Sequence, residues 1–185
     1  MLSEPCILEN NHALIISYPF HFPTDFNHER TWLACTALRL ARVCVEDAYL
    51  HAVKRETFGK PLIDNQIIRA KFAMAGRSID SAHAYLEYLV HLLGRAKRRD
   101  PASEPAGIGG LIANCKVLAC QALERINREA QQVMGGLGYS KSGKGARIEQ
   151  ISRDLRVMVV GGGSEEILTD FSLNQEVKAL ASAKL

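Results

Sequence analysis

The fold is decided by residues 63–97, IDNQIIRAKFAMAGRSIDSAHAYLEYLVHLLGRAK, where apolar side chains recur at steps of mostly three and four residues. The recurring positions are Ile67, Ile68, Phe72, Ala75, Ile79, Ala82, Leu86, Leu89, Val90 and Leu93. In an α-helix, this spacing places side chains on one face. We therefore predict one long helix over this stretch, with Pro61 at its start, where a missing N–H is tolerated.

The helical pattern continues upstream, over residues 28–56. Apolar side chains there occupy more than one face, which is typical of a helix buried in a bundle. They are Trp32, Leu33, Leu38, Leu40, Ala41, Val43, Cys44, Ala48 and Val53. Asp25 or Asn27 is the candidate N-cap of this helix, because a short side-chain oxygen can accept a hydrogen bond from exposed backbone N–H groups.

Downstream, the Pro- and Gly-rich residues 100–110 predict a loop. Further helices are expected over residues 111–134 and 146–157, and a last one from Ser164 towards Leu180. Ser164 is a good N-cap, and Glu165 and Glu166 then lie in the first turn, where acidic side chains are favourable.

These segments predict an all-α protein, an up-and-down four-helix-type bundle formed by residues 25–185. No strand pattern is visible after residue 24. Residues 1–24 differ from the rest, with Pro5, Pro19 and Pro23 around a short apolar run. We interpret residues 1–24 as an irregular segment or the stub of a missing domain.

The composition is that of a soluble globular protein, with 47% hydrophobic and 23% charged residues and a formal net charge of +3, and we expect an intracellular location. The one dense basic run, Lys97-Arg98-Arg99, is interpreted as a solvated helix end, so no nucleic acid is expected as a partner. No apolar run is long enough to span a membrane. The sequence does not distinguish mitochondrion, peroxisome and cytoplasm.

No metal site is expected. The five cysteines show no CxxC pair and no histidine at zinc-site spacing, which favours free thiols in a reducing compartment. A carboxylate-bridged metal pair requires two Glu-x-x-His motifs on helices, and only Glu9–His12 matches, in the irregular segment.

Four motifs exceed what a plain bundle requires. They are Arg55-Glu56-Thr57-Phe58-Gly59 followed by Gln66, then Gln132-Val133-Met134-Gly135-Gly136-Leu137-Gly138-Tyr139, then Arg153-Asp154, and then Gly163-Ser164-Glu165-Glu166-Ile167. Each alone is weak, because glycines end many helices and an Arg-Asp pair is usually a surface ion pair. Their order and spacing, from Glu29 to Ile167, resemble the C-terminal domain of the acyl-CoA dehydrogenase family.

The resemblance implies a set of contacts with FAD. Arg55 would bind the pyrophosphate of a neighbouring subunit's FAD, a task that suits the forked guanidinium. Phe58 would lie beside the adenosine half and Gln66 would hydrogen-bond to the cofactor. Gln132, Gly135 and Gly136 would form a turn whose backbone approaches the same FAD, where a Cβ would intrude. Ser164 and Glu166 would contact the subunit's own FAD.

The resemblance also implies a catalytic base. In many members the base is a Glu directly before the Gly-Thr turn, but Gly162 stands at that position here. Members resembling isovaleryl- and long-chain acyl-CoA dehydrogenases keep this Gly and place the Glu 26 residues before the Arg of R-x-x-F-G. That position is Glu29, followed by Arg30, a substrate-proximal residue by the same likeness. The alternative for Glu29 is an acid in the first helical turn that stabilises the helix dipole.

The implied activity is α,β-dehydrogenation of an acyl-CoA thioester to the 2-enoyl-CoA, with the carboxylate taking the α-proton and the hydride passing to flavin N5. The electron acceptor would be electron-transfer flavoprotein or, in an acyl-CoA oxidase, oxygen. A homodimer or homotetramer is expected. Because the middle and N-terminal domains of the family cannot fit into residues 1–24, the chain would carry the C-terminal domain only. The competing hypothesis is a non-catalytic helical domain for oligomerisation or binding.

Overall fold

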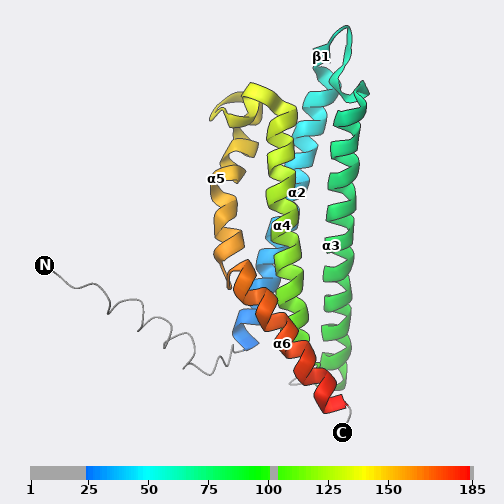
Figure 1. Cartoon of the computed structure of the whole chain (residues 1–185), viewed down its shortest axis with the longest axis vertical. Coiled ribbons are helices and arrows are strands. Elements are labelled where there is room, and N and C mark those ends of the chain that lie inside the picture. Colours follow the sequence, from blue (N-terminus) through cyan, green and yellow to red (C-terminus); the bar gives the residue numbers. More distant parts are fainter. Residues whose placement is uncertain (1–23, 101–103, 184–185) are drawn as a thin grey trace, which may run out of the picture.

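Five α-helices make up most of the part of the chain that the structure describes. The computed structural model covers residues 24–100 and 104–183, and the first four of these helices run alternately up and down it (Figure 1). In chain order they are α2 (Thr24–Lys54), α3 (Gln66–Arg99), α4 (Ile108–Met134), α5 (Ala146–Val160) and α6 (Glu165–Ala183). The all-α bundle is thereby confirmed, with α6 crossing its lower end obliquely.

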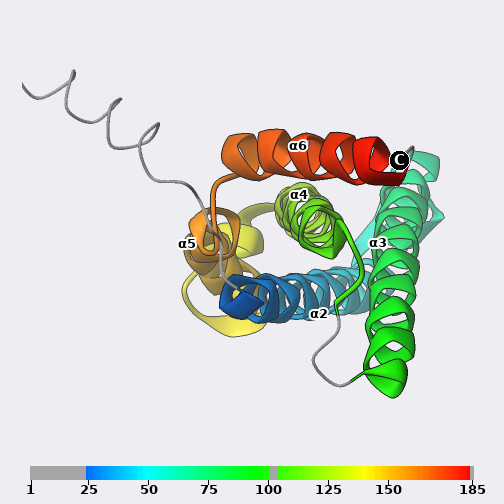
Figure 2. The same ribbon diagram turned by 90° about the horizontal axis from the view of Figure 1, so that it is seen from below.

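Helix α4 forms the centre of the bundle. It packs against α2, α3, α5 and α6, and Figure 2 shows these four arranged around it. Its buried side chains occupy several faces, from Ile108 to Met134. Many core positions of α2 are small, including Ala34, Ala37 and Ala41, all fully buried. Small side chains allow the backbones of α2 and α4 to approach closely along most of their length.

Short non-helical elements connect the helices at the upper end. A two-stranded antiparallel hairpin pairs β1 (Glu56–Thr57) with β2 (Lys60–Pro61), and η1 (Leu62–Asp64) follows it. Two more 3-10 turns, η2 (Gly135–Tyr139) and η3 (Gly143–Gly145), join α4 to α5. The expectation of no strand after residue 24 was therefore wrong by this one small hairpin.

The start of the second long helix also differs from the prediction. Pro61 closes the hairpin and does not enter the helix, and α3 begins only at Gln66. Asn65 caps it, because its side chain accepts a hydrogen bond from the backbone N–H of Ile67 at 2.9 Å. At the other end the helix continues to Arg99, two residues beyond the prediction.

Three further boundaries were misplaced. Helix α2 begins at Thr24, so the positions of Asp25 and Asn27 both lie inside it. Helix α4 begins at Ile108 and includes Gly110, whose missing Cβ explains the error: a Cβ there would lie 2.8 Å from Cβ of Gln175 on α6. The glycine permits close packing of two helices, although the sequence pattern favoured a loop. Helix α5 continues to Val160 rather than ending at residue 157.

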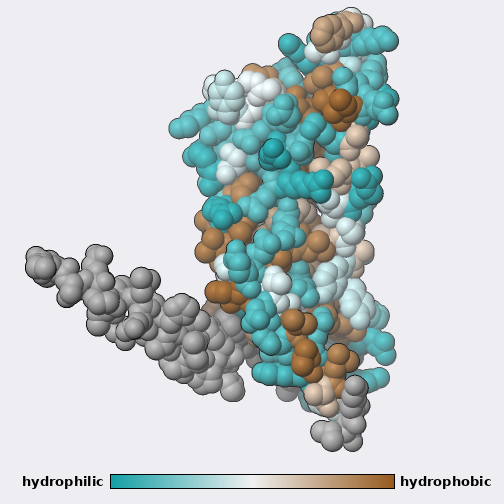
Figure 3. Space-filling view, viewed as in Figure 1, coloured by the Kyte–Doolittle hydropathy of each residue, from teal (hydrophilic) through white to brown (hydrophobic). Residues whose placement is uncertain are grey.

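Several side chains expected in the core are instead exposed. Trp32 is 59% exposed and Val53 44%, and Ile67, Val90 and Leu118 also face outward. Other exposed apolar side chains lie on α5 and α6, namely Val157, Val160, Ile167, Leu173, Val177 and Leu180, and part of this surface is brown in Figure 3. The described part of the molecule therefore has an exposed apolar surface on α5 and α6.

The expectations for residues 1–23, including the interpretation as a stub, lie outside the described residues. Within the described part, no helix is long and apolar enough to cross a bilayer, and no group of three or more His, Cys, Asp or Glu side chains is arranged to hold a metal ion. Of the cysteines in that part, Cys44, Cys115 and Cys120 are buried and Cys35 is exposed, all as free thiols.

Candidate functional site

The predicted site residues separate into two groups at different levels of the bundle. Arg55, Phe58, Gln66, Gln132, Gly135 and Gly136 lie at the upper end, where α2 and α4 finish and α3 begins. Glu29, Arg30, Ser164 and Glu166 lie near the start of α2 and the α5–α6 turn. At 1.5 Å per residue, the 26 positions from Glu29 to Arg55 correspond to about 39 Å along α2. The two groups therefore lie at opposite ends of α2.

The lower group is built around the turn Gly161-Gly162-Gly163. The Nε atom of Arg30 donates a hydrogen bond to the carbonyl oxygen of Gly162 at 2.9 Å, which joins the start of α2 to the turn. The Arg30 side chain is fully buried, and its guanidinium lies over the rings of Phe26 and Phe171 at 5.8 and 5.2 Å from their centroids. Burial lowers the pKa of Arg30.

A second buried cation, Lys116 on α4, holds the same turn from the other side. Its Nζ atom donates to the carbonyl oxygens of Val159, at 2.6 Å, and Gly163, at 2.9 Å. Burial lowers the pKa of this ammonium group. Both cations thus satisfy carbonyl groups at the C-terminal end of α5, where the helix dipole favours positive charge. The sequence analysis missed Lys116, since a single Lys in an apolar helix carries no local signal of its partner.

Glu29 is exposed on α2, directly before Arg30. Because α2 begins at Thr24, Glu29 lies in the second turn and not the first, which removes the expected helix-dipole role at the first turn. Across the turn, α6 begins directly after Ser164. The pKa of Glu166 is lowered, first by a hydrogen bond from its own backbone N–H and then by the Ser164 hydroxyl. The Arg153 guanidinium is engaged separately, with Nε donating to Glu149 at 2.9 Å.

The upper group presents its side chains to solvent. Phe58 sits at the tip of the hairpin with a positive φ of 52°, a backbone conformation that non-glycine residues rarely adopt, and its side chain is fully exposed. Arg55, Gln66 and Gln132 are exposed as well. A Cβ at Gly136 would have no neighbour within 4 Å, so nothing within the described chain requires glycine there.

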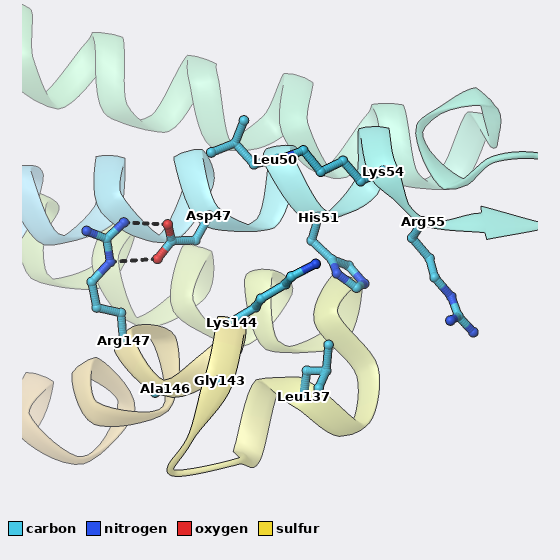
Figure 4. Close-up of a pocket in the computed structure, with 10 residues that line it drawn as sticks. All are labelled: Asp47, Leu50, His51, Lys54, Arg55, Leu137, Gly143, Lys144, Ala146 and Arg147. Atoms are coloured by element: carbon cyan, nitrogen blue, oxygen red, sulfur yellow. Dashed lines mark hydrogen bonds and ion pairs between the residues drawn. The ribbon is translucent and has the colours of Figure 1, made fainter.

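A groove adjoins the upper group, between the end of α2 and the η2–η3 connection (Figure 4). Its volume is about 670 Å³, and it is lined by Asp47, Leu50, His51, Lys54, Arg55, Leu137, Gly143, Lys144, Ala146 and Arg147. Arg55 is the predicted cofactor residue that borders it. The sequence analysis did not find the other basic side chains, because they come from segments nearly 90 residues apart.

The match to known proteins covers most of the chain. The model of the family described as acyl-CoA dehydrogenase, C-terminal domain, matches residues 22–175. The chain belongs to the acyl-CoA dehydrogenase family.

Several members of the acyl-CoA dehydrogenase family are similar along this domain. The acyl-CoA dehydrogenase AFT10-1 of Alternaria alternata is 48% identical over 168 residues, covering 87% of this chain and 37% of that protein. The acyl-CoA dehydrogenase apdG of Emericella nidulans is 34% identical over 154 residues, covering 83% and 34%. The structure of butyryl-CoA dehydrogenase from Megasphaera elsdenii superimposes with a TM-score of 0.68 at 27% identity, covering 84% of this chain and 37% of that one. The chain therefore spans about a third of the length of these acyl-CoA dehydrogenases.

Proposed function

We propose that this chain supplies the helical domain of an FAD-dependent acyl-CoA dehydrogenase, which converts an acyl-CoA thioester to the 2-enoyl-CoA. The observation that carries the proposal is the hydrogen bond between Arg30 and Gly162, because it joins the part of α2 that carries Glu29 to the turn that leads into Ser164 and Glu166. A candidate base and two polar contacts for a flavin thereby belong to one junction, although about 130 residues separate them in the sequence.

The exposed residues of the upper group fit an adenine dinucleotide. Arg55 offers a guanidinium fork suited to a diphosphate, and Phe58 offers an exposed ring near it. The open space at Gly136 allows a ligand to approach the backbone. Since about 39 Å separates the two groups along α2, each FAD would be contacted by the lower group of one subunit and the upper group of another. The proposed assembly is therefore a homodimer or homotetramer.

In the proposed reaction, Glu29 and Arg30 have different tasks. The Glu29 carboxylate accepts the α-proton of the thioester, and the C–H electron pair forms the new double bond as the β-carbon loses hydride. FAD, when bound, supplies the acceptor for that hydride. Arg30 is a positioning residue, because its guanidinium is buried in the bundle and holds the Gly162 carbonyl.

The purified chain with added FAD and acyl-CoA tests the proposal directly. We expect flavin absorbance to co-purify with the chain, and 2-enoyl-CoA to form with an artificial electron acceptor. Glu29→Gln should keep FAD and lower turnover by about 10²–10⁴-fold, the range for loss of a general base. Glu46→Gln, an exposed acid on the same helix, is the matched control and should leave turnover unchanged. A chain that stays colourless with FAD would contradict the proposal.

The exposed apolar side chains support a second candidate, a non-catalytic domain that associates through them. It predicts a stable oligomer without flavin and no effect of Glu29→Gln. The acceptor is a separate question: peroxide formation during turnover would indicate an oxidase, whereas reduction of electron-transfer flavoprotein would indicate a dehydrogenase.

A further inference from the structure

In the described part of the chain, two buried cations hold the turn between α5 and α6 from inside the bundle. Arg30 donates to the carbonyl oxygen of Gly162, and Lys116 donates to those of Val159 and Gly163. Both side chains are buried, and Lys116 is only 1% exposed. They come from α2 and α4, which pack against each other. The turn is therefore anchored to the core of the bundle.

Lys116 reaches both ends of the turn because of its place on α4. Figure 2 shows α4 in the middle of the other helices, with α6 on one side and α2 on the opposite side. Val159 lies in the last turn of α5, and Gly163 lies two residues before the start of α6. The Nζ atom of Lys116 contacts these two oxygens at 2.6 and 2.9 Å. One ammonium group thus fixes the end of α5 relative to the start of α6.

The sequence of the turn does not fix its shape. It consists of three consecutive glycines, residues 161–163, and glycine has the greatest backbone freedom of all residues. Gly162 and Gly163 adopt positive φ angles of 69° and 117°. Because the local residue type permits many other conformations, the hydrogen bonds from Arg30 and Lys116 are what select this one.

The bond to Gly163 also orients Ser164. The described chain contains no cis peptide bond, and in a trans peptide the C=O and N–H groups point in opposite directions. Since the Gly163 oxygen points to Lys116, the backbone N–H of Ser164 points away from Lys116. The Ser164 hydroxyl in turn hydrogen-bonds to the Glu166 carboxylate. The orientation set by Lys116 is therefore passed on to both polar side chains at the start of α6.

Capping of α5 does not account for both bonds of Lys116. A cation at the C-terminal end of a helix satisfies free carbonyl groups and complements the helix dipole. The bond to Val159, inside α5, serves that purpose. Gly163 lies beyond the end of α5, so the bond to its oxygen adds nothing to the cap and acts on the approach to α6.

We propose that Lys116 is a positioning residue for the flavin: it holds Ser164 and Glu166 where they meet the cofactor, without contacting the cofactor itself. The proposal rests on the proposed function, which assigns Ser164 and Glu166 to the flavin. It gives the buried lysine a task in cofactor binding in addition to its contribution to stability.

The test compares Lys116→Met with a variant that is destabilised elsewhere. Lys116→Met keeps an unbranched side chain of similar length and removes the donor. We expect it to raise the hydrogen-exchange rates of the amides of residues 163–168 by about tenfold or more. We also expect it to weaken FAD binding by about tenfold, as residues without ligand contact can do. Both are measured on the full chain, well below its melting temperature.

Ala82→Gly is the matched control. Ala82 is fully buried on α3, and glycine there lowers the stability of the helix without changing any contact of the turn. It should leave both the exchange of residues 163–168 and the affinity for FAD unchanged. Lys116→Gln keeps an N–H donor on a shorter side chain and should lie between Lys116→Met and the unaltered chain in both measurements. It decides the case if Lys116→Met does not fold.

The outcomes separate this proposal from the proposed function. Equal FAD affinity of Lys116→Met and the unaltered chain would overturn the positioning role and leave the proposed function standing. Unchanged exchange at residues 163–168 would overturn it as well, and so would an equal loss of FAD affinity in Ala82→Gly. An unaltered chain that binds no FAD would contradict the proposed function together with this proposal.

Discussion

The Nε atom of Arg30 donates a hydrogen bond to the carbonyl oxygen of Gly162 at 2.9 Å, across 132 positions of sequence. Gly162 takes a φ of 69°, and a Cβ there would lie 3.2 Å from both Cγ of Arg30 and Cδ1 of Leu33. Two features of position 162 therefore favour glycine: the positive φ of its backbone and the closeness of the Arg30 and Leu33 side chains.

Gly162→Ala tests this requirement. We expect the free energy of unfolding to fall by about 1–3 kcal/mol, the usual cost of a strained backbone, as measured by urea denaturation. Gly143→Ala is a matched control, because it also has a positive φ (74°) but no neighbour within 4 Å of a Cβ. It should cost less than Gly162→Ala. Equal losses would show that the contact with Arg30 and Leu33 carries no weight.

Lys116→Met tests the second cation on the turn. The substitution leaves the carbonyl oxygens of Val159 and Gly163 without their buried donor. We expect a loss of about 1–3 kcal/mol in the free energy of unfolding. Lys178→Met, on the exposed side of α6, should have almost no effect, and an unchanged midpoint for Lys116→Met would contradict the assigned role.

Gly145→Ala should disturb the connection between α4 and α5. The added Cβ would meet the Leu137 carbonyl oxygen at 1.9 Å, so η3 must move away from η2 and take Lys144 with it. We expect a lower melting temperature together with weaker binding of pyrophosphate. Circular dichroism and calorimetric titration of the same sample would measure the two effects.

Gly136→Ala should lower the affinity for FAD without lowering the melting temperature. A Cβ at this position has no neighbour within 4 Å, so the melting temperature should stay within about 1–2 °C of the unaltered chain, as for most exposed substitutions. Affinity for FAD should fall if the cofactor approaches this backbone, as proposed. Unchanged affinity would remove Gly136 from the set of cofactor contacts.

FAD binding should become tighter as the pH falls from 7 to about 5.5, below the reference pKa of histidine. The pKa of His51 is lowered from 6.5 by burial, Arg55 and Lys144, so its imidazole is neutral at pH 7. An anion in the groove raises that pKa. Binding is then accompanied by proton uptake, and affinity rises by at most about tenfold per pH unit for one proton.

The charged groups that line the groove with His51 are Lys54 at the end of α2, Arg55 directly after it, Lys144 on η3, and the Asp47–Arg147 pair. His51→Gln removes only the titrating group and should make the affinity for FAD independent of pH in this range. A pH dependence that persists in His51→Gln would assign the proton uptake elsewhere.

Whether an apolar residue of a predicted helix is buried depends on which other elements lie next to it. The apolar period of residues 63–97 predicted the buried side chains of α3 correctly at Ala75, Ile79, Ala82, Leu86 and Leu89. The same reasoning failed at Trp32 and Val53 of α2. These are apolar in type, but they lie on a face that no other described element covers. Periodicity reports what a helix can bury and does not report which of its faces has a partner.

The sequence by itself determined the helical class, the order of the long helices, and the motifs that assign the family, because these depend on local spacing and residue type. Only the tertiary structure decided that Arg30 and Lys116 converge on one glycine turn. It alone brought Lys144 opposite His51 and Arg55. Contacts between residues from 43 to 132 positions apart leave no local trace in the sequence, since they arise from the packing of helices whose individual patterns do not specify the partner.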